Sequence, residues 1–213
     1  MGALKRRFGR RFDLKNPESG RHIHVSQDFE RFTSGTRFIR HFLEAKKQIG
    51  YGPKKRKTTV NGVTVTLLPR GEFANFAYKV EVLGRVFFVK EQVMGKVRGE
   101  AYRPEYDLAT PQALALQKAR RLLPKKRYPN LEIAVPHIAW TKKGTSFLVT
   151  DFYNGTLLEK TPKGKIPKNI YSQFIKASKE MDSRGFRDFG DNNAIWCPEE
   201  QKIVVFDIYQ AKS

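Results

Sequence analysis

The stretch GFRDFGDNNAIW at residues 185–196, with VVFD following at residues 204–207, decides how the rest of the chain is interpreted. Asp188 lies five residues before Asn193, and Asp207 lies fourteen residues after Asn193, at the end of a β-branched run. Carboxylate and amide oxygens suit a hard cation, and an exposed carboxylate suits proton transfer. The spacing therefore predicts a strand–turn–strand that carries one base and two metal ligands.

The composition is that of a folded protein with one domain, or with a small domain and an arm. Of its 213 residues 39% are hydrophobic and 16 are Phe, which is enough for a packed core. The sequence has no apolar run near the length of about 18 residues that a membrane span needs. Cys197 is the single cysteine, so an intrachain disulfide is excluded and a reducing, cytoplasmic compartment is expected.

The charge is strongly basic, with 41 Lys+Arg against 21 Asp+Glu and a net charge of +20. Residues 1–57 hold 16 basic and 5 acidic side chains, so the excess is densest there. A charge of this size predicts a polyanionic partner, either nucleic acid or an anionic surface. The Arg-rich start suits an organelle transit peptide or an electrostatic arm, and the absence of a following apolar run excludes a secretory signal.

Residues 1–57 are expected to form a basic N-terminal arm that mixes cationic clusters with aromatic side chains. Such an arm could neutralise phosphates while its aromatics stack. It could equally be a solvated tail whose apolar residues pack onto the body, and the sequence leaves both open. A helix is expected over residues 36–49, with Phe38 and Phe42 on a common face.

The remaining pattern predicts an α+β fold in which a mostly antiparallel sheet with one helix is followed by a small helical part. Asn61-Gly62 between β-branched runs signals a hairpin, and a second turn is expected at residues 83–85. Thr110-Pro111 should open a helix, and strands are expected over residues 133–140 and 146–152. Asn169 to Arg184 should form a helix that precedes a closing hairpin and buries one stripe of side chains: Ile170, Phe174, Ala177 and Met181.

Three further motifs precede this stretch in the sequence, and a fourth overlaps its start. They are LPRGEFANF at residues 68–76, FFVK at 87–90, LVTDFYNG at 148–155 and MDSRGFRD at 181–188. Together they resemble the glycine-rich loop, lysine strand, hinge and catalytic loop of the protein-kinase-like phosphotransferases. The nearest members are the small atypical kinases: RIO kinases, aminoglycoside phosphotransferases and lipopolysaccharide-core kinases.

The resemblance implies a kinase-like small lobe over residues 58–158 and a truncated large lobe over residues 159–213, since the sequence ends six residues after Asp207. It implies ATP and Mg²⁺ as cofactors. The roles that it implies are Gly71 in the phosphate loop, Lys90 on the phosphates, Glu105 as the partner of Lys90, backbone groups of Asp151 and Tyr153 on the base, Asp188 as the catalytic acceptor-orienting group, and Asn193 and Asp207 on the metal.

Two functions follow from these features. One is an ATP- and Mg²⁺-dependent phosphotransferase that acts on an anionic or partner-presented substrate. The other is a catalytically silent kinase-fold module that binds RNA, a ribonucleoprotein or an anionic surface through its basic face. Retention of Lys90, Asp188, Asn193 and Asp207 favours the enzyme, whereas the altered glycine loop favours the binding module.

Overall fold

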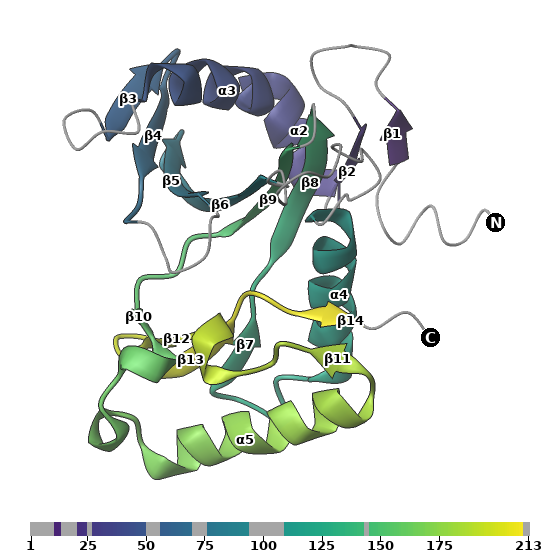
Figure 1. Cartoon of the computed structure of the whole chain (residues 1–213), viewed down its shortest axis with the longest axis vertical. Coiled ribbons are helices and arrows are strands. Elements are labelled where there is room, and N and C mark those ends of the chain that lie inside the picture. The colour runs from purple at the N-terminus through teal and green to yellow at the C-terminus, as the bar shows by residue number, and fades with distance from the viewer. Residues whose placement is uncertain are drawn as a thin grey trace, which may run out of the picture. The chain divides into compact units, whose positions relative to one another are not determined.

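The computed structural model shows an α+β protein whose chain divides into two compact units (Figure 1). Unit 1 comprises Met1–Thr110 and Pro136–Phe152, and unit 2 comprises Pro111–Val135 and Tyr153–Ser213. The structure describes residues 11–13, 21–24, 27–49, 56–69, 76–93, 109–142 and 145–210.

Unit 1 is built on an eight-stranded sheet whose neighbours are all antiparallel, in the order β1-β2-β8-β9-β6-β5-β4-β3. This confirms the predicted antiparallel sheet. Its strands are β1 (Arg11–Asp13), β2 (Arg21–His24), β3 (Lys57–Val60), β4 (Val63–Leu67), β5 (Phe76–Val82), β6 (Arg85–Val93), β8 (Pro136–Lys142) and β9 (Thr145–Asp151).

Two tight turns set the register of this sheet. Asn61 and Gly62 have φ of 47° and 79°, and Leu83 and Gly84 have φ of 48° and 73°. Positive φ at both central residues is the turn geometry that matches the twist of antiparallel strands. Both predicted hairpins are therefore confirmed, the second with a solvent-exposed leucine at a position that usually takes Asn or Gly.

Helices α2 (Gln27–Thr36) and α3 (Phe38–Gln48) supply much of the core of unit 1. Phe29, Phe38 and Phe42 are almost fully buried, and the Phe42 ring meets Tyr78 and Trp140 edge-on. Residues 27–49 thus pack onto the sheet instead of forming part of a separate arm. Burying these rings removes a large apolar area from water, which outweighs the basic character of the surrounding sequence.

Unit 2 pairs a small sheet with two helices (Figure 1). The sheet order is β10-β12-β13-β7, and only β13 and β7 run parallel. A separate two-stranded ladder joins β11 to β14. The strands are β7 (Leu131–Ile133), β10 (Thr156–Leu157), β11 (Phe186–Arg187), β12 (Ala194–Cys197), β13 (Lys202–Val205) and β14 (Tyr209–Gln210).

The helices of unit 2 follow the predicted pattern. Helix α5 (Lys168–Ser183) packs against β7, β11 and β13. It buries Ile170, Phe174, Ala177 and Met181, which is the predicted stripe. Helix α4 (Ala109–Leu122) begins one residue before the expected Thr110.

The single strand expected over residues 133–140 is two strands, β7 and β8, which belong to different units. The backbone N–H of Ala134 donates to the carbonyl of Val205, which extends the pairing of β7 with β13. Pro136 has no N–H to donate and begins β8 in the large sheet. Among the described residues, no helix is both long and apolar enough to cross a membrane.

Candidate functional site

Strand β6 places Lys90 in the middle of the large sheet, between Ala77 on β5 and Leu148 on β9. Its relative exposure is only 9%, so Lys90 is not a surface lysine. A buried ammonium needs hydrogen-bonding or charged partners, which makes this position unusual for a lysine without a role. The proposed contact of Lys90 with nucleotide phosphates stays a prediction.

The neighbouring Glu91 is buried on the opposite face of β6 and has its own partners. The Tyr78 hydroxyl donates to Glu91 Oε2 at 2.6 Å, and Lys46 Nζ donates to Glu91 Oε1 at 2.6 Å. Lys46 also lies over the Phe147 ring. Sequence reasoning missed this network, because the three polar residues come from α3, β5 and β6 and share no local motif.

Two predicted members of the nucleotide site lie outside the described residues. They are Gly71 in the expected phosphate loop and Glu105, the expected partner of Lys90. Their assignments therefore stay predictions.

The predicted hinge coincides with a point where the chain passes from unit 1 to unit 2, between Phe152 and Tyr153. Asp151 ends β9, and its Oδ1 lies 2.7 Å from His137 Nε2. A carboxylate can only accept, so the imidazole donates from Nε2. The His137 ring stacks on Phe29, and both aromatic rings are buried in unit 1.

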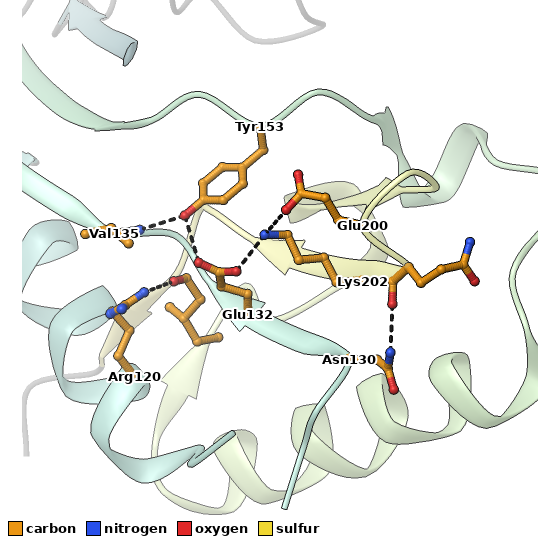
Figure 2. Close-up of polar contacts among 9 residues, drawn as sticks. Arg120, Asn130, Glu132, Val135, Tyr153, Glu200 and Lys202 are labelled. Carbon is orange, nitrogen blue, oxygen red and sulfur yellow. Dashed lines mark hydrogen bonds and ion pairs between the residues drawn. The ribbon is translucent and has the colours of Figure 1, made fainter. Parts of the chain in front are cut away.

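Tyr153 belongs to a polar network within unit 2 (Figure 2). Its hydroxyl accepts from the backbone N–H of Val135 at 3.3 Å and donates to Glu132 Oε1 at 3.2 Å. Lys202 Nζ lies 5.2 Å from the centre of the Tyr153 ring. These hydrogen bonds hold the Tyr153 side chain in place. The expected contact of its backbone with a nucleotide base stays a prediction.

Lys202 joins two carboxylates in the same network (Figure 2). Its ammonium pairs with Glu132 Oε2 at 2.8 Å and also with Glu200. Burial lowers the pKa of Lys202, but the hydrogen bonds to Glu132 and Glu200 outweigh burial and leave that pKa raised. The cluster is a satisfied structural network in which Lys202 stays charged at neutral pH.

Asp188 follows the short ladder formed by β11 and β14. Arg187 pairs with Tyr209 in this antiparallel ladder, so Asp188 and Asp207 both lie just beyond the same end of it. Asp188 is exposed and adopts a left-handed backbone conformation with φ of 64°. Only a few residue types tolerate that conformation, and Asp is one of them.

Asn193 is hydrogen-bonded to Asp188 and to Phe206, the residue before Asp207. Its side-chain Nδ2 donates to the carbonyl of Asp188 at 2.9 Å. Its own carbonyl accepts from the backbone N–H of Phe206 at 3.0 Å, one residue before Asp207. The structure thus gathers Asp188, Asn193 and Asp207 at one junction in unit 2, which we call the acidic junction.

Gln112 is a further member of this junction that sequence reasoning did not identify as such. It is fully buried on α4, and its Nε2 donates to Asp207 Oδ1. Its Oε1 has no hydrogen-bond partner among the described residues. The sequence does not show which residue of α4 faces Asp207, because the two residues are 95 positions apart.

Helix α5 supports the loop that bears the junction. The Ser178 hydroxyl donates to the carbonyl of Phe189 at 2.7 Å, and the Phe174 and Phe189 rings stack. Tyr171 donates to Asp191 Oδ2 at 3.0 Å. Burial raises the pKa of Tyr171, and the hydrogen bond to Asp191 raises it further. The loop is therefore anchored to a helix on both sides of Gly190.

The chain's cysteine takes no part in this chemistry. Burial raises the pKa of the Cys197 thiol to about 11, and nearby Glu200 adds to the rise. The thiol is protonated at neutral pH, and a buried neutral thiol is a poor nucleophile. The acidic junction, rather than the thiol, is the candidate reactive centre of unit 2.

Comparisons with known proteins give one informative result. No family model matches the chain, and no curated protein matches it. Among solved structures the chain is similar to the BubR1 kinase domain, at 12% sequence identity and a TM-score of 0.47. The match covers 86% of this chain and 60% of that chain, so this chain spans less than two thirds of that kinase domain. At this identity and TM-score, the similarity says nothing of activity or substrate.

Proposed function

We propose that the protein is a kinase-like phosphotransferase that uses ATP and Mg²⁺. The observation that carries the proposal is the acidic junction, where Asn193 bonds directly to Asp188 and its backbone meets the residue before Asp207. Phosphoryl transfer needs positioned charges more than covalent chemistry, and an orienting carboxylate beside two oxygen ligands meets that need.

The donor set at the junction fits Mg²⁺. Because the Asp188 carbonyl can only accept, the Asn193 atom that faces it is the amide nitrogen, which leaves the amide oxygen for another partner. Asp207 supplies a carboxylate held by Gln112. Mg²⁺ is commonly bound by one or two carboxylates together with substrate phosphates, so a cage of three or more acidic or His ligands is not required.

Each side chain then has a definite task. Asn193 and Asp207 would hold the cation, which neutralises charge on the phosphates when bound. Asp188 would accept the proton of the acceptor hydroxyl as its oxygen attacks the γ-phosphorus and the bond to the bridging oxygen of ADP breaks. Lys90 would contact the nucleotide phosphates, and backbone groups of Asp151 and Tyr153 the adenine.

The test is a thermal titration of the full chain with ATP and Mg²⁺. Binding to the native state should raise the melting temperature through linkage, and only when both ligands are present. The variant Asp207→Asn should lose the Mg²⁺-dependent part of the shift. Asp182→Asn is the matched control, since Asp182 is an exposed acid of the same unit at the end of α5.

The outcomes are distinct. A shift that needs Mg²⁺, that survives in Asp182→Asn and that disappears in Asp207→Asn would support the proposal. No shift at millimolar nucleotide would rule out the nucleotide site, and an equal shift in all three proteins would rule out Asp207 as its metal ligand. Release of ADP in the presence of candidate alcohols would then identify the acceptor.

A further inference from the structure

Residues 160–179 contain six lysines and no acidic residue, which makes them a strongly basic segment of unit 2. Five of these lysines are exposed. We call them the lysine surface: Lys160, Lys165, Lys168, Lys176 and Lys179. They belong to η1 (Leu158–Lys160), η2 (Lys163–Lys165) and α5.

Helix α5 presents three of these lysines on one side. At about 100° per residue, Lys168, Lys176 and Lys179 fall within one exposed sector together with Ser172 and Ile175. The buried stripe of α5 occupies the opposite sector and packs against β7, β11 and β13. From Lys168 to Lys179 the helix extends about 16 Å, so the ammonium groups form a row rather than a point.

The charge of the lysine surface is not neutralised within the part of the chain that the structure describes. None of the five lysines has an ion-pair partner there, whereas Arg127 and Arg184 both pair with Glu180. The Glu180 carboxylate also accepts from Tyr128. The acid that follows Lys179 in sequence is thus already engaged, and Asp182 lies one turn beyond Lys179.

The chemistry of the row favours a nucleic acid over a membrane. A helix that lies in a membrane interface turns a broad apolar face outward, but the apolar face of α5 is buried and only Ile175 is exposed on the lysine side. A duplex carries one phosphate charge per roughly 1.7 Å of axis, so a row of about 16 Å faces several phosphates. Lysine is suited to such contacts because it binds phosphate as a point charge.

We infer that the lysine surface binds the phosphate backbone of a nucleic acid without reading its sequence. The surface is separate from the residues assigned to nucleotide and metal binding, so it does not depend on the proposed phosphotransfer. It also lies in unit 2, whereas the polyanion contact expected from the sequence was placed in residues 1–57.

The test measures binding of the full chain to short fluorescein-labelled RNA and DNA duplexes by anisotropy at several salt concentrations. Each neutralised phosphate contributes about 0.9 to the slope of log K against log salt. The triple variant Lys168→Gln, Lys176→Gln and Lys179→Gln should lower that slope by about 2 to 3 and weaken binding at least about 10-fold. Scrambling the duplex sequence should change little.

The matched control removes the same charge from unit 1. Arg31, Lys47 and Lys57 are exposed and have no ion-pair partner among the described residues, and their change to Gln should alter affinity much less. Equal losses in the two triple variants would overturn the inference, because binding would then follow net charge alone. Binding to phosphatidylserine-containing vesicles with none to either duplex would overturn it as well.

Discussion

The buried network around Glu91 and the acidic junction that contains Asp188 each hold a carboxylate, but in opposite environments. Glu91 is 2% exposed, and each of its carboxylate oxygens receives a hydrogen bond from Tyr78 or Lys46. Asp188 is exposed, and it is fixed through its backbone carbonyl by Asn193 while its carboxylate faces solvent. A buried, satisfied carboxylate contributes to structure, whereas an exposed carboxylate on a fixed backbone is available for chemistry.

The largest expected effect concerns Asp188, the exposed member of this comparison. Asp188→Asn should lower phosphoryl transfer on the order of 10³-fold, because an amide cannot accept the proton of the acceptor hydroxyl. The free energy of unfolding should hardly change, since Asn also tolerates the left-handed backbone at φ of 64°. Turnover assays and urea unfolding of the same preparation measure both quantities. If Asp188→Asn lost stability together with turnover, Asp188 would be a structural carboxylate like Glu91.

Glu91→Ala tests the structural role of the buried network. Removing one member of a buried ion pair leaves Lys46 and Tyr78 without their acceptor, so the loss of stability should be about 3 kcal/mol. Glu81→Ala is the control, because Glu81 forms an exposed pair with Lys79 that should contribute less than about 1 kcal/mol. Urea denaturation gives both values. Similar losses would mean that the Glu91 network is no stronger than a surface pair.

Gln112→Leu tests a contact between the two kinds of group. The buried Gln112 side chain donates to the Asp207 carboxylate, which is proposed to bind Mg²⁺. Losing the donor should raise the Mg²⁺ concentration needed for half-maximal activity about 10-fold. Stability should change little, since leucine is of similar size and removes the unpaired Oε1. Gln117→Leu, from another turn of α4, is the control. An unchanged Mg²⁺ requirement would show that Asp207 does not need this glutamine.

The smallest effect concerns Glu180, whose carboxylate links α5 to the turn after α4. The hydrogen bond from Tyr128 lowers the pKa of Glu180, burial opposes that change, and Arg127 and Arg184 reinforce it. A lowered pKa stabilises the fold fully above the ordinary value of 4.5, and this contribution is lost as the pH falls through the folded-state pKa.

Glu180→Gln should therefore be less stable than the wild type at neutral pH by about 1 kcal/mol or less, and the two should converge in acid. Unfolding midpoints measured across the acidic range test this. A difference between the two proteins that stays constant below pH 4.5 would show that the ionised carboxylate is not what stabilises the link.

Local sequence was enough wherever one segment decides its own structure. Asn61-Gly62 and the stripe from Ile170 to Met181 were predicted and confirmed, because turn chemistry and helical periodicity act over a few residues. The partners of Glu91 and Asp207 could not be predicted, since Lys46 and Gln112 are 45 and 95 residues away from them. No periodicity encodes which distant side chain a buried carboxylate will meet.

The sequence by itself determined the α+β class, the hairpins and the spacing that brings Asp188, Asn193 and Asp207 into one unit. Only the tertiary structure decided that Phe29, Phe38 and Phe42 belong to a core rather than to an arm. It also decided that residues 133–140 divide between two sheets and that Gln112 holds Asp207. The physical reason is that burial and long-range pairing depend on which parts of the chain come into contact. A local sequence pattern shows only which side of each helix or strand is apolar.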